Sequence, residues 1–357
     1  MSNFHFLILD SAVPDQKSRW CDYWRMWPDR EVFAHPDYVR LFASGNQRSL
    51  CAIGQMPSGC VLYPFLLRPL AAEPWVESGE TAWDLISPYG YGGAFAWNLT
   101  AVEAGEFWSR FEKWCTSQNV VSSFVRLSLF PHQILTFNGE NESKQSNIIR
   151  SLDPTPDDLW MDYEHKVRKN VKRARESGLR FEIDVAGQRL DEFLAIYHTV
   201  MTLRDAEASY FFPRVFFESI VRDLAGQFAF FHIFQESRMV STELVLISAR
   251  HVYSFLGGTL PDAFLQRPND LLKHEVILWA RESGKQAYVL GGGYQGDDGI
   301  FRYKKSFAPS GSTPFHVGKK IHDPLAYARL IDQRRRWEQQ GDKSWRPRSG
   351  WFPEYRA

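Results

Sequence analysis

Short apolar runs separated by turn residues dominate the first part of the chain. Strands are predicted where such runs alternate with polar positions or stay apolar, and helices where apolar side chains recur every three or four residues. The predicted strands are 4–9, 49–54, 60–67, 83–86 and 120–130. Helices are predicted at 15–27, 37–43 and 100–118, with a glycine- and tyrosine-rich loop at 87–93. The polar segment 138–146 is expected to be a linker or a surface excursion.

The second part of the chain carries a longer series of elements. One strong helix is predicted at 157–177, because Pro156 precedes it, Gly178 follows it and its apolar side chains form one stripe. Further helices are predicted at 190–203, 213–224 and 269–283, with a short one at 302–305. Further strands are predicted at 179–185, 228–234, 240–248, 251–256, 287–290 and 314–317.

The stretch 290–307 reads LGGGYQGDDGIFRYKKSF and offers the clearest candidate chemistry. Three glycines follow a short buried strand, so the backbone there carries no side chains. A loop with Asp297 and Asp298 then leads into a helix with two adjacent lysines, Lys304 and Lys305. This combination suits an anionic or carbonyl-containing substrate. A tight turn followed by a solvated basic helix is the alternative that involves no ligand.

Composition predicts a globular protein with two domains. The chain has 357 residues, of which 44% are hydrophobic and 15% aromatic, which is enough for two cores. Its formal net charge is zero, so a nucleic-acid-binding surface has to be local. The four cysteines lack metal-ligand spacing, and neither a signal peptide nor a membrane-spanning run is found in the sequence. These features predict a cytoplasmic protein without a metal site.

The order of the predicted elements in the second part resembles that of the GNAT acetyltransferase fold. In that fold two central strands separate from each other, and acyl chemistry takes place between them. The first part repeats a similar order more loosely. The expected class is therefore α+β with two GNAT-like lobes, each a mixed, mostly antiparallel sheet flanked by helices. We expect an N-terminal, acceptor-side lobe at 1–150, a C-terminal, donor-side catalytic lobe at 151–318, and a basic and aromatic tail at 319–357 that packs on the first lobe.

Five sequence pieces in the second part, taken in order, resemble the FemABX-type aminoacyltransferases of the GNAT superfamily. They are HKVRKNVKRARESGL at 165–179, YHTVMTLRDAEASYFF at 197–212, YSFLGGT at 253–259, PNDLLKHEVILWARESG at 268–284 and LGGG with FRYKKSF within 290–307. The resemblance covers 157–310 well, and SPYGYGG at 87–93 is the best match before it. It implies transfer of an aminoacyl group from a charged tRNA to an amine of a cell-envelope precursor, a sugar or a peptide natural product, which forms an amide bond.

The resemblance also implies roles for residues near the reacting atoms. Lys304 occupies the position of the family's lysine in YKKSF, and it is expected to face the reacting carbonyl or the tRNA terminus, with Lys305 as its substitute. Asp297, or its neighbour Asp298, is expected to orient the attacking amine, and Tyr253 to hydrogen-bond the amine or the carbonyl. The alternatives are a surface lysine, a solvated loop carboxylate and a core tyrosine.

Substrate-binding residues are expected in both lobes. Arg204 and Tyr210 lie where the resemblance places an anion-binding arginine and a tyrosine, and the planar fork of arginine suits a phosphate. An ion pair of Arg204 with a neighbouring carboxylate is the alternative. Tyr89 and Tyr91 of the first-lobe glycine loop are candidates for the acceptor site, with packing as the alternative.

The predicted helix 157–177 carries several cations opposite its apolar stripe. Those proposed to bind nucleic acid are Lys166, Lys169, Lys172 and Arg173. Cations grouped on one side of a helix neutralise phosphates with a salt-dependent affinity, as the acceptor stem of a tRNA would require. A solvated helix face is the alternative. The tail 329–348 combines arginines and tryptophans, and is expected either to extend this surface or to strap the first lobe.

The glycine-spaced loop with which GNAT enzymes hold the pyrophosphate of acetyl-CoA on backbone N–H groups has no counterpart in the sequence. The corresponding segment, 257–268, reads GGTLPDAFLQRP. This favours aminoacyl-tRNA as co-substrate, without a bound cofactor, over acyl-CoA. Two alternatives stay open: an N-acyltransferase that uses acyl-CoA or an acyl-carrier protein, and a non-catalytic binding or scaffold protein of the same fold.

Overall fold

The computed structural model describes residues 4–205, 207, 210–294, 297–340 and 345–357. The chain forms two compact units. The first unit comprises the residues up to Pro28, Phe33–Lys144 and Phe315–Ala357, and the second unit comprises Asp29–Val32 and Gln145–Pro314. A short N-terminal segment therefore belongs to the second unit, and the C-terminal segment belongs to the first.

The sheet of the first unit contains one parallel pair of strands among antiparallel neighbours. Its strands are β1 (His5–Asp10), β2 (Arg48–Gln55), β3 (Cys60–Pro69), β4 (Trp83–Ile86), β5 (Phe95–Trp97), β6 (Val120–Arg126) and β13 (Ser312–Ile321). They follow the order β1-β2-β3-β4-β6-β13, and β5 pairs with β3. The parallel pair is β4 with β6.

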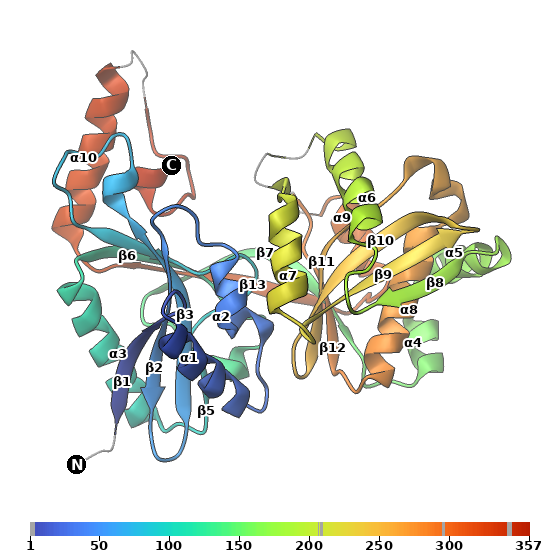
Figure 1. Ribbon diagram of the computed structural model, residues 1–357, viewed down its shortest axis with the longest axis horizontal. Coiled ribbons are helices and arrows are strands. Elements are labelled where there is room, and N and C mark those ends of the chain that lie inside the picture. The colour runs from blue at the N-terminus through green and yellow to red at the C-terminus, as the bar shows by residue number, and fades with distance from the viewer. Residues whose placement is uncertain (1–3, 206, 208–209, 295–296, 341–344) are drawn as a thin grey trace. The chain divides into compact units, whose positions relative to one another are not determined.

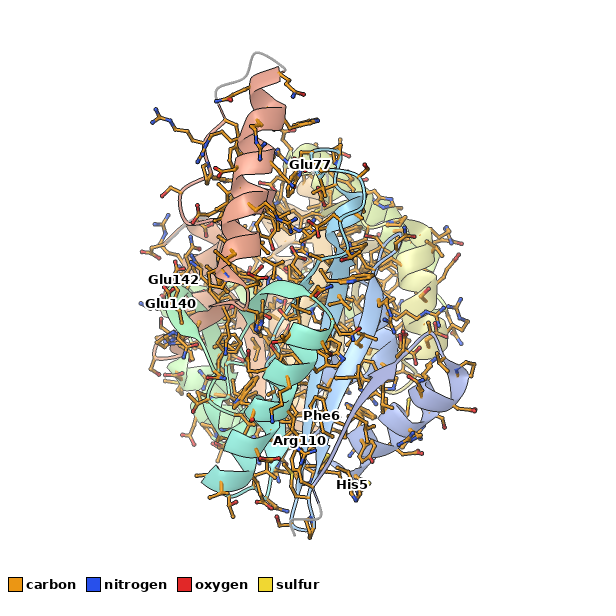
Figure 2. The ribbon with its side chains drawn as sticks, turned by 90° about the vertical axis from the view of Figure 1, so that its left-hand side faces the viewer. His5, Phe6, Glu77, Arg110, Glu140 and Glu142 are labelled. Carbon is orange, nitrogen blue, oxygen red and sulfur yellow. The ribbon has the colours of Figure 1, made fainter. Side chains whose placement is uncertain are left out.

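The helices of the first unit pack on this sheet through aromatic side chains. They are α1 (Pro14–Met26), α2 (Pro36–Arg40), α3 (Ala101–Ser117) and α10 (Pro324–Gln340), with 3-10 turns η1 (Val32–Ala34), η2 (Leu70–Ala72), η3 (Pro131–Gln133) and η6 (Glu354–Arg356). A capping box of Thr100 and Glu103 begins α3. Figure 2 shows Phe6 and Arg110 at the contact of β1 with α3, where the Phe6 ring lies 5.9 Å from that of Phe107.

The C-terminal segment adds a small core of its own to the first unit. Tyr327 and Leu330 of α10 and Tyr355 of η6 are buried together with Leu70 and Trp75. Because these side chains come from both ends of the unit's sequence, the segment is an integral part of the first unit.

The strands of the second unit also include one parallel pair, β11 with β12, and β7 enters this unit at Gln145. Its strands are β7 (Glu140–Ser151), β8 (Arg180–Asp184), β9 (Phe228–Gln235), β10 (Arg238–Ile247), β11 (His251–Thr259) and β12 (Ala287–Gly291). They follow the order β7-β12-β11-β10-β9-β8. With the first unit, this confirms the predicted α+β class of mixed, mostly antiparallel sheets flanked by helices.

Helices cover both faces of the second unit's sheet (Figure 1). They are α4 (Pro156–Asp162), α5 (His165–Glu176), α6 (Leu190–Leu203), α7 (Arg214–Asp223), α8 (Pro268–Glu282) and α9 (Gly299–Lys305), with a 3-10 turn η5 (Pro261–Gln266). The Phe231 ring lies 4.9 Å from Trp279 of α8, and the ring of its neighbour Phe230 lies 4.8 Å from Phe193 of α6. Since successive side chains of a strand point to opposite faces, α8 and α6 lie on opposite faces.

The single helix predicted at 157–177 is wrong, because the structure has two helices there. The chain turns extended at Tyr163 and Glu164, between α4 and α5. Tyr163 is buried with its ring 5.5 Å from that of Phe307, and the Glu164 N–H donates to the Ser306 carbonyl. The Arg168 guanidinium donates to the carbonyl of Tyr163. Packing and capping therefore override a helical pattern that is continuous in the sequence.

The segment 138–146, predicted to be a linker or a surface excursion, is exposed or half-buried and contains the boundary between the units at Lys144 and Gln145. Most of it nevertheless lies in a strand, β7. Ile149 pairs with Val289 of β12, and Ile148 is fully buried. The polar part of the strand is held by ion pairs, since Glu142 binds both Lys144 and Lys319. In the described part of the chain, no helix combines the length and the apolar content needed to cross a bilayer.

Candidate functional site

Two neighbouring strands of the second unit separate after a short parallel ladder. β11 and β12 are paired at His251–Ala287, Val252–Tyr288 and Tyr253–Val289, and the ladder ends there. Beyond Tyr253, β11 continues as the partner of β10 alone, whereas β12 continues along β7. Backbone groups on the facing edges of the two strands thus lose their ladder partners at the point where the predicted motif 290–307 begins.

A cluster of buried polar side chains lies on the α8 side of this separation. Its members are Glu243 of β10, Ser254 of β11, Lys273 of α8 and Tyr288 of β12. The Lys273 Nζ donates to the Glu243 Oε1, to the Ser254 Oγ at 2.8 Å and to the Tyr288 hydroxyl at 3.1 Å. The Tyr288 hydroxyl in turn donates to the Glu243 Oε1 at 2.8 Å. Burial, followed by the nearby Glu243 carboxylate, raises the pKa of Tyr288 well above its usual value.

Two buried oxygen atoms at this cluster have no hydrogen-bond partner among the described residues. They are the Oε2 of Glu243 and the hydroxyl of Tyr303. Glu243 is only 4% exposed, so its second oxygen has given up water without gaining a protein donor. Such groups are costly to bury, which makes them candidates for contact with a bound substrate.

Helix α9 brings Lys304 to the same place. Asp298 caps the helix by accepting the Phe301 N–H at 2.7 Å. From the last turn, the Lys304 Nζ donates to the Gly292 carbonyl at 2.6 Å. Burial and, after it, the positive charge of Lys273 lower the pKa of Lys304 to about 8. An amine with that pKa carries a proton at neutral pH and can also release it.

The glycines that precede α9 have a geometric reason to be there. Gly291 has a φ of +83°, in the left-handed region that favours glycine. A Cβ on Gly293 would lie 2.6 Å from the Asp298 Oδ1, so any side chain there would displace the cap of α9. These two positions allow the chain to turn from β12 into the helix that carries Lys304.

Tyr253 does not join this cluster. Its side chain is 3% exposed, and its hydroxyl donates to the Glu31 Oε2 at 2.7 Å. The second oxygen of Glu31 lies 2.7 Å from the Nδ1 of His251. Because Tyr253 and Ser254 are consecutive on β11, they point to opposite faces of the sheet. The structure thus places Tyr253 in a buried polar contact away from Lys273.

The other residues expected near the reacting atoms are exposed. The Asp297 carboxylate contacts no donor among the described residues, and its carbonyl accepts from Arg302 at 2.8 Å. Asp298, by contrast, is occupied as the helix cap. Lys305 is exposed and forms no ion pair with a described residue. Of the two lysines, Lys304 is therefore the one that approaches the buried cluster.

Of the expected substrate-binding residues, Arg204 and Tyr210 lie in the same unit as Lys304, and neither forms a hydrogen bond or an ion pair with it in the described structure. Arg204 is exposed at the C-terminal end of α6, without an ion pair to a described residue. Tyr210 is half-buried, and its carbonyl accepts from the Tyr197 hydroxyl. Tyr89 and Tyr91 belong to the first unit. Tyr89 is 41% exposed, whereas the Tyr91 ring packs 5.4 Å from Phe33 and burial raises its pKa.

The four cations proposed to bind nucleic acid all lie on the exposed side of α5. Lys166 forms an ion pair with Glu164 at 3.1 Å. Lys169, Lys172 and Arg173 are exposed and have no ion-pair partner in the described chain. Three unneutralised cations within two turns of a helix make a local positive surface.

Sequence reasoning missed Glu243, Ser254, Lys273 and Tyr288. A signal for two of them is present, because Glu243 interrupts the apolar strand MVSTELVLI and Lys273 interrupts the apolar helix LLKHEVILWA. Charged residues are rarely buried unless they are paired. No group of three histidine, cysteine or carboxylate side chains in the described residues has the arrangement of a metal site.

Comparison with known proteins finds a similarity in the segment that holds this cluster. Residues 162–305 match the family model of the acetyltransferase (GNAT) domain. No curated protein matches the chain in sequence.

Among solved structures, the chain resembles FemX with a TM-score of 0.65 at 10% identity, over 87% of this chain and 97% of that one. It resembles L-PGS from Bacillus licheniformis with a TM-score of 0.51 at 10% identity, over 94% and 99% of the two chains. The C-terminal domain of a putative lysylphosphatidylglycerol synthetase from Agrobacterium fabrum gives a TM-score of 0.51 at 11% identity, over 87% and 92%. At these identities the likeness shows a shared fold. The chain therefore has a fold like that of FemX, and its residues 162–305 match the model of the acetyltransferase (GNAT) domain.

Proposed function

We propose that the protein is an acyltransferase that moves an aminoacyl group from aminoacyl-tRNA to a primary amine. The observation that carries this proposal is the position of Lys304, whose pKa is lowered to about 8, beside the buried Glu243–Lys273 cluster where β11 and β12 separate. The resemblance to FemX supports aminoacyl transfer in particular, and the match to the GNAT domain supports acyl transfer in general.

The reaction forms a C–N bond and breaks the C–O ester bond to the tRNA. The attacking amine loses a proton, and the leaving oxygen gains one. Protonated Lys304 stabilises the negative charge that develops on the carbonyl oxygen, as preorganised cations do in dry sites. Because its pKa is about 8, it also supplies a proton to the leaving oxygen near neutral pH.

Two features of the second unit favour tRNA as the donor: exposed cations on α5 and the backbone of the turn η5. The unneutralised cations of α5 suit a phosphate backbone. The segment that holds CoA pyrophosphate in GNAT enzymes forms the turn η5, and its Ala263 and Arg267 N–H groups donate to the carbonyls of Leu260 and Phe264. Pro268, which has no N–H, follows directly. Two backbone donors of this segment are thus used within the turn, which supports a proposal without a bound cofactor.

The acceptor in this proposal is an amine of a cell-envelope precursor, a sugar or a peptide. The proposed contacts of that acceptor remain Arg204, Tyr210, Tyr89 and Tyr91. We also still propose that Asp297 orients the attacking amine and that Tyr253 hydrogen-bonds the amine or the carbonyl. Because charged tRNA is made in the cytoplasm, the proposal places the reaction there.

The deciding experiment measures binding of total charged tRNA by the full chain at 50 and 200 mM salt, with acetyl-CoA measured in parallel. We expect micromolar tRNA binding that weakens steeply with salt. The double variant Lys169→Glu/Arg173→Glu should bind at least about tenfold more weakly and lower the salt slope by about 2. The matched control is Arg40→Glu/Lys113→Glu, which makes the same charge change at two exposed cations of the first unit.

Equal loss of tRNA binding in both double variants would show non-specific attraction and contradict a binding surface on α5. Saturable acetyl-CoA binding without tRNA binding would replace the proposal by the second candidate, an N-acyltransferase that uses acyl-CoA. That candidate is favoured by the description of the matched family model as an acetyltransferase domain.

A further inference from the structure

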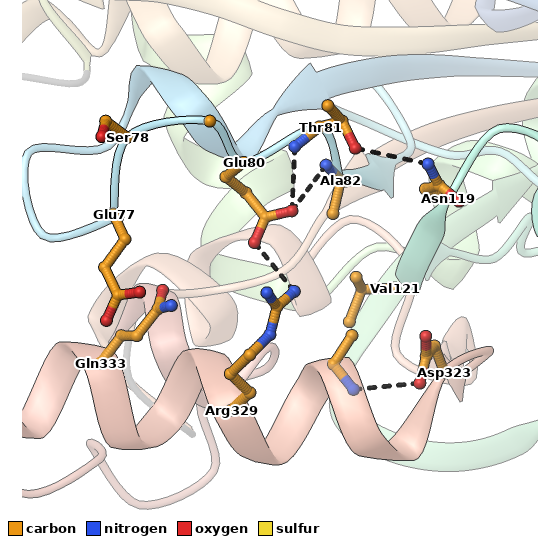
Figure 3. A pocket seen from close by; sticks show the side chains of 12 residues that line it. Glu77, Ser78, Glu80, Thr81, Ala82, Asn119, Val121, Asp323, Arg329 and Gln333 are labelled. Carbon is orange, nitrogen blue, oxygen red and sulfur yellow. Dashed lines mark hydrogen bonds and ion pairs between the residues drawn. The ribbon is translucent and has the colours of Figure 1, made fainter.

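The first unit holds a polar cavity of about 400 Å³ that the proposed reaction does not use. The loop 77–82 forms one side of it and the exposed start of α10 the other, as Figure 3 shows. Asn119 and Val121 complete the lining. The volume lies in the range of sites that hold small ligands.

The charges around the cavity are mostly negative. Three carboxylates line it, from Glu77, Glu80 and Asp323, against one guanidinium, from Arg329. Arg329 is bound to the Glu80 Oε2 at 2.9 Å, so its charge is already matched. Two formal negative charges are left over, on Glu77 and Asp323.

Two of the three carboxylates are committed to the fold. The Glu80 Oε1 accepts the N–H groups of Thr81 and Ala82 at 3.0 and 2.9 Å. The Asp323 Oδ1 accepts the N–H groups of Leu325 and Ala326 at 3.0 Å each, at the start of α10. Glu77 is different, because its carboxylate contacts no donor among the described residues.

The second unsatisfied group is buried. Gln333 is 4% exposed, lines the cavity, and its Oε1 has no hydrogen-bond partner among the described residues. Figure 3 shows its amide and the Glu77 carboxylate directed toward each other. A buried amide oxygen without a donor is uncommon in folded proteins. The cavity therefore presents a carboxylate and an amide acceptor that the fold itself leaves unpaired.

We propose that this cavity binds a small organic cation with primary ammonium groups. An ammonium offers three N–H donors and no acceptor, which matches the free Glu77 carboxylate and the Gln333 Oε1. The two uncompensated negative charges favour a compact dication over a neutral or anionic molecule. The site lies entirely within the first unit, and the inference does not depend on aminoacyl transfer.

The test uses the full chain and three linear probes of equal length: 1,5-diaminopentane, 1,5-pentanediol and glutarate. Calorimetry at low salt should show that the diamine binds at least about tenfold more tightly than the diol, with no binding of glutarate. Glu77→Gln should weaken diamine binding about fivefold, because it removes a partly solvated charge. Gln333→Met, which fills the same volume without the acceptor, should weaken it by a similar factor.

Glu140→Gln is the matched control, since Glu140 is an exposed glutamate of the same unit that lies well away from Glu77 (Figure 2). It should leave diamine binding unchanged. Equal binding of diamine and diol would show a hydrated polar cavity and overturn the proposal. Equal weakening of diamine binding by Glu77→Gln and Glu140→Gln would mean diffuse surface attraction and would also overturn the proposal. The absence of any diamine binding would overturn it as well. Glu77 is exposed, so its variant tests the idea even if Gln333→Met fails to fold.

Discussion

In each unit a strand at or next to the parallel strand pair carries a buried carboxylate, and the hydrogen bonds of these two carboxylates differ. Asp84 of β4 is fully buried in the first unit. Its Oδ1 accepts from Arg68 at 2.7 Å, and its Oδ2 accepts from Arg356 at 2.5 Å and from the Tyr355 hydroxyl at 3.3 Å. In Glu243 of the second unit, all donors converge on one oxygen and the other has no described partner.

The difference separates a structural carboxylate from one that is available for chemistry. Asp84 uses both oxygens to fix the C-terminal residues Tyr355 and Arg356 to β4. Glu243 holds Lys273 in place with one oxygen and keeps an acceptor free close to Lys304. A buried carboxylate on a similar sheet can therefore have a structural or a chemical role. Which role it has depends on which of its oxygen atoms lack a hydrogen-bond partner.

The largest expected effect is the loss of stability when Asp84 is replaced. Asp84→Asn leaves the Arg68 guanidinium, 16% exposed, without a charged partner among the described residues, and leaves Arg356, 13% exposed, with Glu73 as its remaining ion-pair partner. We expect the free energy of unfolding to fall by about 3–5 kcal/mol, as when one member of a buried pair is removed. Hydrogen exchange of peptides from β4 and β6 would measure this, with Glu140→Gln as an exposed control. A loss below about 1 kcal/mol would show that Asp84 is not the anchor of the C-terminal segment.

Replacing Glu243 is expected to lower the rate of the reaction more than it lowers stability. Glu243→Gln should lower the rate of aminoacyl transfer from charged tRNA to a soluble primary amine about 100-fold, which corresponds to about 2.7 kcal/mol. The same change leaves the Lys273 amine buried without its counter-ion, so stability falls as well. A single variant therefore does not separate the two effects.

The double variant Glu243→Gln/Lys273→Met separates them. Replacing both members of a buried ion pair by uncharged groups of similar size is often neutral for stability. We expect thermal stability to return close to that of the original protein while the rate stays low. Recovery of the rate together with stability would mean that the cluster only supports the fold.

The elements were largely predictable because their apolar periodicity survives in the structure. β4 was predicted at 83–86 and is observed as Trp83–Ile86, and the hairpin of β2 and β3 lies within a few residues of its prediction. The failures are places where distant contacts decide. Tyr163 interrupts the helix because Phe307 receives its ring, and the polar start of β7 is held as a strand by Lys319. Neither partner is visible in the local pattern.

The candidate site was predictable only where a motif marks it. Lys304 was found because YKKSF is a local pattern, and the structure adds the reason for its lowered pKa. Glu243 and Lys273 lie thirty residues apart on different elements, so only the fold shows that they meet. The sequence also does not show that Tyr253 and Ser254 point to opposite faces of β11, because a one-residue step along a strand decides which face a side chain points to.

The smallest expected effect is a pH dependence of stability that arises from two buried histidines of the second unit. Burial lowers the pKa of His274 and of His232, both in the second unit, to about 4. Between pH 6.5 and 4 the unfolded chain binds protons that the folded chain does not, so stability is lost as the pH falls through this range. For His274 alone the loss between pH 6.5 and 4.5 is about 2 kcal/mol.

Urea unfolding at these two pH values measures the loss. In His274→Gln the difference between the two pH values should shrink by about 2 kcal/mol, because the group that takes up the proton on unfolding is gone. His5→Gln, at an exposed position of β1, should leave it unchanged. Parallel pH dependence in all three proteins would mean that His274 stays protonatable in the folded state. The expected result would place an acid-sensitive group in the unit that also carries Lys304.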